Sequence, residues 1–582
     1  MLPCYNQVGS AEHSPHPRGP QRFTGMCPRG AVATLATYDS GTIEPAAGGH
    51  VKAEVAATGR LRAMSPYGAF VYNILTMGLI FPWVFLWGPW AFPAGHLPTA
   101  ILIATALELP LALCYVWLAT SMPRSGGDYL FQSRVLGGGI AFTVVFSGLV
   151  IWSLQWVALS GWLMAVLGIA PALLALGVIW DSPTLVAAGL AVQSPTGIVT
   201  TTIVFSLAAA VLLTRGFKRF VRLQYWLFYS TMLALVALLV QFVTGDPGTF
   251  AAGADRAALA IDGTRDYYAG VIAQAGGAGA DLTPAFSWLA TLAIAPIAWT
   301  SLQWASYSVE QGGEIEGAAK FRNQAFIIVG SLVFTGLVLA FLAWALERAV
   351  GEEFLLAASS LYYSSGESSA RAIEPFPSVL AMIMTSSPLI VLAIGVGFVA
   401  NSFQIFCNVY IGTARNIVAM SMDGLLPKRL GRVSHRWHSP ASAYYAYFFA
   451  SILWILAYNY APGWRGYTLG VTFASGYVFA LSGLAAALLP RKAGRIYGQS
   501  AGSRYTVAGV PLVTILGLLG ATLAGVMVLA MALHPGYGLT GLVPRILIVG
   551  VIALSAGWYL LVRRRAESAK TAFRGLSERP RT

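Results

Sequence analysis

The sequence predicts an all-α integral membrane protein that crosses the bilayer twelve times. Of its 582 residues, 57% are apolar and 10% are charged, and the mean hydropathy is +0.67. A soluble domain carries about 25% charged residues, whereas a run of 18 or more apolar residues is long enough to cross a bilayer as a helix. Twelve such segments occur, at about 69–91, 98–121, 136–168, 197–214, 219–243, 285–309, 324–347, 387–419, 440–459, 467–489, 507–532 and 540–562.

The net charge of +13 follows this topology and does not indicate nucleic-acid binding. With the N-terminus inside, all but six of the 36 Lys and Arg residues fall on the inner side, as the positive-inside rule requires. We therefore expect a multi-pass protein of the cell membrane with both termini in the cytoplasm. The clearest inner clusters lie at 215–222, 428–436, 491–495 and 563–565.

The ends of the chain are expected to be tails. Residues 1–65 are rich in Gly, Pro and Ala without periodicity, which predicts a disordered cytosolic segment, and Met26 or Met64 could be the true start. Residues 563–582 are predicted to form a basic cytosolic tail. The four cysteines show no disulfide or zinc spacing, so we expect neither a metal nor a cofactor.

Two of the predicted spans carry helix-breaking residues near their middle. The first, 69–91, contains Gly78 and Pro82, and the sixth, 285–309, contains Pro296. Proline removes a backbone donor and blocks the carbonyl one turn back. Because an unpaired backbone group in lipid costs several kcal/mol, such a break survives only beside protein or a polar cavity. The alternative is a pair of kinks that serve helix packing alone.

The spacing of these breaks predicts an inverted repeat. They lie five spans apart, and because five is odd the two halves have opposite orientations, as in many transporters. The repeats are expected at 66–243 and 285–489, with the last two spans, 507–562, outside them. The connections at about 244–284 and 348–386 could carry short lid helices.

Three inner segments resemble the amino acid–polyamine–organocation (APC) superfamily of permeases. They read MPRSGGDY at 122–129, EQGGEIEG at 310–317 and TARNIVAMSMDGLLP at 413–427, and the resemblance covers about 66–565. It implies a LeuT-type fold, in which substrate binds where the first and sixth spans unwind. That family usually has Gly-Ser-Gly before Ile-Phe in the first span. Here Met77-Gly78-Leu79 takes its place, which puts an ordinary α-amino acid in doubt.

The expected substrate site lies between the two breaks. An unwound helix offers N–H groups to an anion and C=O groups to a cation, and these suit a carboxylate and an ammonium. Trp299 is expected either as an aromatic gate or as core packing. The candidate substrate-binding residues are Met77, Gly78, Leu79, Ile80, Phe81, Ala295, Pro296, Ile297, Ala298, Trp299, Gln155 and Ser475.

Charged and polar residues inside spans supply candidates for ion coupling and gating. Glu108 suits a proton relay, or a protonated acid that only bonds a neighbouring helix. Asn401 and Ser402 suit sodium ligation together with first-span carbonyls, or plain interhelical hydrogen bonds. The inner-gate candidates are Arg124, Glu310 and Glu314, with a solvated helix end as the alternative.

The expected function is secondary active transport of an amino acid, an amine or a related small organic solute. The resemblance implies alternating access: spans 1, 2, 6 and 7 rock against the rest around a midplane site between spans 1, 3, 6, 8 and 10. The expected partners are a small-molecule substrate, the lipid bilayer and a coupling ion, either a proton or sodium. Alternatives are an ion-independent exchanger or facilitator, a solute sensor with the same fold, and a membrane-embedded enzyme. The enzyme is disfavoured because no cluster of catalytic residues is present.

Overall fold

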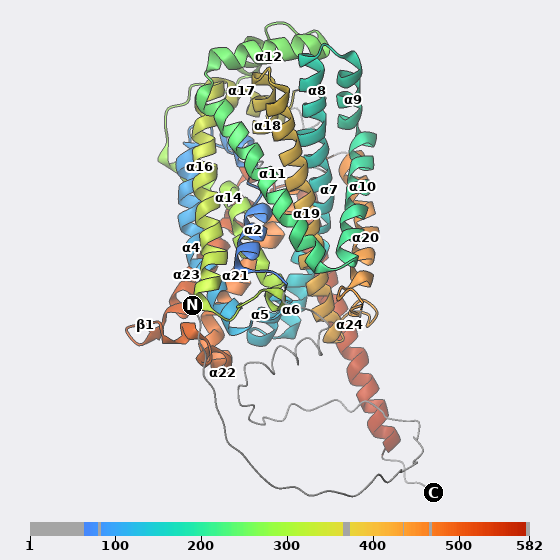
Figure 1. The fold of residues 1–582 in the computed structure, drawn as a ribbon. Coiled ribbons are helices and arrows are strands. Elements are labelled where there is room, and N and C mark those ends of the chain that lie inside the picture. The colour runs from blue at the N-terminus through green and yellow to red at the C-terminus, as the bar shows by residue number, and fades with distance from the viewer. Residues whose placement is uncertain are drawn as a thin grey trace, which may run out of the picture. The chain divides into compact units, whose positions relative to one another are not determined.

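The chain folds into a bundle of helices that run side by side (Figure 1). The structure, a computed structural model, describes residues 63–79, 83–364, 373–434, 436–461, 463–464 and 468–577, with the backbone alone over 468–472 and 566–577. The described part is helical apart from short turns and one two-stranded hairpin, β1 (Thr506–Val507) with β2 (Val510–Pro511). An all-α architecture is thus confirmed. The predicted N-terminal tail lies outside the described residues except for 63–65.

Among the residues that the structure describes, ten helices are long and apolar enough to cross a membrane, and each corresponds to a predicted span. They are α4 (Leu97–Ser121), the run α6–α8 (Gly138–Ile179), α10 (Pro195–Thr214), α11 (Phe217–Thr244), the run α15–α16 (Phe321–Val350), α19 (Pro388–Met422), α20 (Ala441–Tyr460), Phe473–Lys492 of α21 (Thr468–Lys492), α23 (Leu512–Leu533) and Leu542–Arg565 of α24 (Leu542–Ser577). The two predicted spans without such a helix are the first and the sixth. Twelve crossings therefore stay a prediction.

The first predicted span contains two helices, α2 (Pro66–Met77) and α3 (Val84–Ala91). Ser65 caps α2 by accepting the Gly68 N–H at 3.0 Å. Gly78 follows α2 in the left-handed conformation (φ 74°, ψ 65°), which glycine adopts without the Cβ penalty of other residues. Residues 80–82, including Pro82, lie outside the described residues.

The sixth predicted span is not interrupted at the residue that the sequence indicated. Its helix α14 (Trp288–Leu302) continues through Pro296, so the predicted break at that residue is wrong. Residues around Pro296 are buried, and α14 packs against α3 and α4, so protein surrounds the site where proline removes a helical hydrogen bond. The α-helical ladder ends six residues later and gives way to the 3₁₀ segment η3 (Gln303–Glu310).

The third predicted span is longer than the sequence suggested. The helical run reaches Ile179 rather than 168 and is followed by the short helix α9 (Pro183–Gln193). The connections at 244–284 and 348–386 do carry short helices, α12 (Pro247–Asp262), α13 (Tyr267–Gly277), α17 (Glu352–Ser364) and α18 (Pro377–Met384). These lie at one end of the bundle, and α5 (Gly127–Val135), α22 (Gly494–Gly498) and β1 lie at the other (Figure 1).

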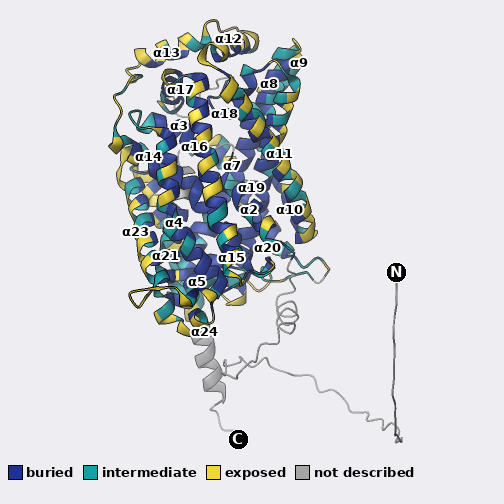
Figure 2. Ribbon diagram, turned by 60° about the vertical axis from the view of Figure 1, so that its left-hand side comes forward, coloured by how far each residue is buried: buried dark blue, intermediate teal, exposed yellow. Residues whose placement is uncertain are grey.

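Burial separates the inside of the bundle from its flanks (Figure 2). Elements around η3 are buried almost throughout, whereas α10, α11, α23 and α24 expose apolar side chains outward. Large apolar side chains on a continuous exposed face are expected where lipid, not water, surrounds a helix. The buried centre is where the candidate site lies.

Candidate functional site

The centre of the bundle is built around Trp304 of η3. Its ring makes edge contacts with Trp156 of α7 (Leu154–Met164) at 5.7 Å, with Tyr307 at 5.1 Å and with Phe479 of α21 at 5.5 Å, measured between ring centroids. The interplanar angles, 84°, 85° and 89°, are those of favourable edge-to-face pairs. Aromatic rings from α7 and α21 therefore pack against η3, which adds Tyr307 of its own.

The segment η3 is fastened to α2 and α19. The Ser308 backbone N–H donates to the Asn73 side-chain oxygen at 2.9 Å, and the Tyr72 and Tyr307 rings stack at 6.3 Å. The Tyr307 hydroxyl lies against Gly412 so closely that an added Cβ there would lie 2.2 Å from the oxygen. A glycine is therefore required on α19 at this contact.

Several polar side-chain atoms at this centre are buried and have no hydrogen-bond partner among the residues that the structure describes. On η3 they are Gln303 Oε1, Trp304 Nε1, Ser306 Oγ and Ser308 Oγ, and the indole nitrogen of Trp156, whose ring contacts Trp304, is another. Buried polar groups in proteins are almost always paired, and each exception needs an explanation. Chemically, the indoles can only donate, the amide oxygen can only accept, and the hydroxyls can do either.

The predicted first-span residues lie close to this segment. Met77, Gly78 and Leu79 are buried at the end of α2, and Ile80 and Phe81 lie outside the described residues. Asn401 of α19 donates to the Leu75 carbonyl at 3.1 Å. Within the described ranges its own side-chain oxygen and the Ser402 hydroxyl are buried without a partner, and the hydrogen bond to Leu75 places the Asn401 side chain next to the last turn of α2.

The predicted sixth-span residues, Ala295 to Trp299, are all buried in α14. The Trp299 indole donates to the Glu108 carboxylate of α4, so two residues predicted for different roles contact each other. The Trp299 ring also lies against Gly476 of α21, where a Cβ would come within 3.1 Å. Ser475, the neighbour of Gly476, is buried as well.

Gln155 has a structural partner. Its side-chain oxygen accepts a hydrogen bond from the Trp464 indole at 3.1 Å. That contact ties α7 to the segment before α21 and engages the side-chain oxygen of a candidate substrate-binding residue.

Of the inner-gate candidates Arg124, Glu310 and Glu314, only the two acids are buried. Arg124 is exposed, and Glu314 forms a two-pronged ion pair with Arg415 of α19, with both N–O distances at 2.9 Å. The two side chains are only 1% and 2% exposed. Arg415 also donates to the Tyr444 hydroxyl at 2.9 Å. Sequence reasoning missed Arg415 as a site residue, although a cation inside the apolar segment 387–419 was a usable signal.

Backbone pairing closes the same end of the bundle. The amides of Ala63 and Met64 donate to the Glu314 carbonyl at 2.9 and 3.1 Å, and the Glu316 amide returns a bond to the Met64 carbonyl. The Gly126 amide donates to the Glu310 carbonyl at 2.9 Å. We call these contacts, together with the Arg415–Glu314 pair, the inner closure.

Two buried acids meet beside the inner closure. The Asp128 amide donates to a Glu310 carboxylate oxygen at 3.3 Å, and Tyr115 and Ser482 donate to the Asp128 carboxylate. Burial raises the pKa of Glu310 well above its usual value, and the Asp128 charge raises it further. Burial also raises the pKa of Asp128, against the opposing effect of its two hydroxyl donors. The pair therefore favours holding a proton.

In the part of the chain that the structure describes, no group of three or more His, Cys, Asp and Glu side chains is placed to hold a metal ion. A comparison with curated protein sequences finds no match. The profile of the amino acid permease family matches residues 90–554, which is most of the chain and includes α4, α7, η3, α19 and α21. The chain therefore belongs to the amino acid permease family of the APC superfamily and is a multi-pass membrane protein of a transporter family.

Proposed function

We propose that the protein is a secondary active transporter for an amino acid, an amine or a related small organic solute. The substrate would bind at mid-membrane where α2 gives way to α3 and α14 gives way to η3, with α7, α19 and α21 around it. Membership of a permease family supports transport rather than catalysis. The proposal also takes α2 with α3, and α14 with η3, as two interrupted spans, which brings the number of crossings to twelve.

The observation that carries this proposal is the run of buried polar atoms on η3. Gln303, Trp304, Ser306 and Ser308 each leave an atom unpaired with respect to the described chain. In a low-dielectric interior each such atom costs roughly 1–3 kcal/mol unless a ligand or water pairs with it. A solute that brings both acceptors and donors would recover this cost, as an amino acid or amine-containing solute can.

The rings of Trp156, Trp304 and Phe479, which we call the aromatic surround, restrict the solute to one with an apolar part. Trp156, Trp304 and Phe479 present ring edges and faces from three elements around the polar run. A small polar solute would leave those rings without contact, whereas an apolar or cationic group can pack on them. The presence of Met77 and Leu79 beside Gly78 agrees with a solute that is not limited to a compact α-amino acid.

Alternating access would require the inner closure to open. In the structure the closure is formed, so the site would be sealed from the side on which α5 and α22 lie. We assign that side to the cytoplasm of the cell, with both termini there. Rocking of α2, α4, η3 and the run α15–α16 would then have to break the contacts of Glu314.

Two ions, a proton and sodium, are the candidates for coupling. A proton could use Glu108, whose carboxylate contacts Trp299 next to the aromatic surround. Sodium could use the Asn401 and Ser402 oxygens with first-span carbonyls, because hard cations take oxygen ligands. Glu108→Gln should abolish coupling in the first case and leave it intact in the second.

A two-step experiment tests the proposal. The purified protein is first screened by thermal shift against amino acids and amines, because a ligand that binds only the folded state raises the melting temperature. Hits are then tested for uptake into proteoliposomes with an imposed proton or sodium gradient. Uptake that is driven by one gradient supports the proposal; gradient-independent uptake indicates a facilitator or exchanger. Binding without any uptake indicates a sensor and contradicts transport.

A further inference from the structure

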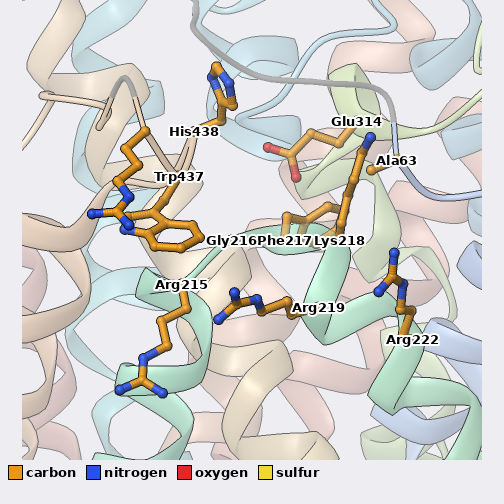
Figure 3. Close-up of a pocket in the computed structure, with 11 residues that line it drawn as sticks. Ala63, Arg215, Gly216, Phe217, Lys218, Arg219, Arg222, Glu314, Trp437 and His438 are labelled. Atoms are coloured by element: carbon orange, nitrogen blue, oxygen red, sulfur yellow. The ribbon is translucent and has the colours of Figure 1, made fainter.

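A cavity of about 270 Å³ lies beside the inner closure (Figure 3). It is formed where α10 meets α11 and where the chain turns between α19 and α20. Five of the side chains around it are cationic, and the described residues that line it are Ala63, Arg215, Gly216, Phe217, Lys218, Arg219, Arg222, Glu314, Arg436, Trp437 and His438. We call it the basic pocket.

Two of the cations in the basic pocket are arranged around one aromatic side chain. The guanidinium carbons of Arg219 and Arg436 lie 4.9 and 4.8 Å from the Trp437 ring centroid, so one indole contacts a cation from the first turn of α11 and a cation from the connection between α19 and α20. Gly216 makes the turn between α10 and α11 at φ 110°, which a side chain would strain. This turn brings Lys218 and Arg219 toward the space between Trp437 and Glu314 (Figure 3).

The charge of the basic pocket is not neutralised by its own lining. Glu314 is the single acid among the described residues that line it, and its carboxylate is already held by Arg415 at 2.9 Å. The Glu314 charge is therefore compensated from within the bundle. Five cations are left to attract an anion, and the guanidinium fork matches the oxygens of a phosphate.

The basic pocket continues into a lipid-facing stripe of α11. Arg222, Trp226, Tyr229 and Leu233 follow one another at helical intervals of four, three and four, so they share one face. Trp226 is 75% exposed, Tyr229 56% and Leu233 59%, although all three are large and mainly apolar. In a membrane protein such a face contacts acyl chains, and an amphipathic Trp or Tyr belongs near the headgroups.

We propose that the basic pocket binds the phosphate headgroup of an anionic phospholipid, whose acyl chains lie along the Trp226–Leu233 stripe. A pocket of cations at the start of an apolar stripe matches a molecule with an anionic head and apolar tails. The positive-inside rule explains why these inner segments are basic, but it does not require cations from two of them to converge on one indole. The inference depends on the membrane placement of α11 and is independent of the substrate site.

The test measures lipid binding to the full-length protein in detergent by native mass spectrometry. Phosphatidylglycerol is the probe and phosphatidylcholine, which is zwitterionic, is the reference lipid. The triple variant Arg219→Gln/Arg222→Gln/Arg436→Gln removes three pocket cations. Since each basic residue near a membrane surface contributes about 1 kcal/mol to anionic lipid binding, we expect at least a tenfold loss of phosphatidylglycerol affinity.

The matched control removes the same charge from another inner cluster. Arg491→Gln/Lys492→Gln/Arg495→Gln changes three exposed cations outside the pocket lining and should keep the wild-type affinity. Equal losses in the two triple variants would mean that net charge alone recruits lipid and would overturn the proposal. So would equal binding of both lipids, or displacement of phosphatidylglycerol by inorganic phosphate, which would identify a site for a free anion.

A charge-preserving variant is the control for misfolding of the triple Gln variant. Arg219→Lys/Arg222→Lys/Arg436→Lys keeps the positive-inside pattern and removes only the guanidinium geometry. It should retain most of the phosphatidylglycerol affinity, because the positive charges that attract the headgroup are kept, and it should lose less affinity than the Gln variant. A Lys variant that melts as wild type but binds no phosphatidylglycerol preferentially over phosphatidylcholine would contradict the electrostatic part of the proposal.

Discussion

The side chains of Arg415 and Glu314 in the inner closure and those of Ser306 and Ser308 in η3 are equally buried, yet only the first two have partners among the described residues. In the inner closure Arg415, Glu314 and the backbone of Met64 all have partners at about 3 Å. A few residues earlier, Ser306 and Ser308 bury hydroxyls that no described residue bonds. Buried polar groups that are paired stabilise one conformation. Buried polar groups that are unpaired become favourable only when a ligand or water bonds to them. The comparison predicts that mutations in the two regions will affect different measurements.

The strongest test removes Arg415. Arg415→Met would leave the Glu314 carboxylate buried without its cation, and breaking a buried ion pair costs about 3–5 kcal/mol of folding free energy. We expect a large fall in the melting temperature of the purified protein. Adding Glu314→Gln to the same chain should recover much of the loss, because the buried charge is then gone.

Arg124→Met is the matched control for this change. Arg124 is exposed and lies in the loop that pairs with η3, so its loss should cost less than about 0.5 kcal/mol. A melting temperature for Arg124→Met as low as that for Arg415→Met would mean that the paired region has been assigned to the wrong residues.

The acid pair beside the inner closure predicts a pH dependence. Because burial raises the pKa of Glu310 above its usual 4.5, the folded protein holds a proton that the unfolded chain releases as pH rises. Stability is then fully present below the unfolded pKa and falls by about 1.4 kcal/mol per pH unit until the folded pKa is passed. Glu310→Gln should flatten this fall and raise the melting temperature at alkaline pH.

The exposed Glu316 provides the comparison for Glu310. Glu316→Gln removes one carboxylate from the same segment without touching the buried pair, so the melting profile against pH should stay that of the wild type. If both variants flattened the profile alike, the effect would belong to net charge rather than to the Asp128–Glu310 contact.

Two buried tryptophans allow a direct comparison between a paired and an unpaired indole N–H donor. The Trp87 indole donates to the Gly536 carbonyl at 2.8 Å, whereas the Trp304 indole has no acceptor in the described chain. Trp87→Phe leaves a carbonyl unpaired and should cost about 1–3 kcal/mol of stability. Trp304→Phe should cost less stability than Trp87→Phe, because it breaks no hydrogen bond to a described residue, and should weaken solute binding about two- to tenfold, which the thermal-shift and uptake assays would measure. Unchanged solute binding in Trp304→Phe would remove η3 from the site.

Most of the fold could be predicted from apolar length alone. A helix in lipid must satisfy its backbone internally, so ten predicted spans coincide with long helices whose ends differ by a few residues, the third span excepted. The third span extends to Ile179 because residues 170–179 are as apolar as those before them, and nothing in the sequence marked an earlier end. Composition therefore locates a span more reliably than it locates the end of one.

The candidate site could be predicted only in part. Pro296 is the obvious helix breaker in the sequence, but tertiary packing keeps α14 helical at that residue. The α-helical hydrogen bonding gives way to 3₁₀ at Gln303, which is not a helix-breaking residue. Gln303, Ser306 and Ser308 of η3 were therefore overlooked. The Arg415–Glu314 pair joins positions about a hundred residues apart, and only the fold brings them together, whereas Arg124 looked plausible because it lies in a family-like motif.

The smallest expected effect concerns Gly78, and it distinguishes a site residue from a turn residue. Gly78 and Gly263 both follow a helix in the left-handed conformation, at φ 74° and 80°. Alanine at either position should cost a similar amount, about 1–2 kcal/mol, because a Cβ crowds the following carbonyl in this conformation. Gly263 ends α12, with nothing within 4 Å of an added Cβ, and its substitution should leave solute uptake unchanged. Gly78→Ala should reduce uptake beyond what its stability loss explains, because it stiffens the backbone between α2 and α3 that the substrate is proposed to contact. Equal uptake by the two variants would mean that the end of α2 serves packing alone.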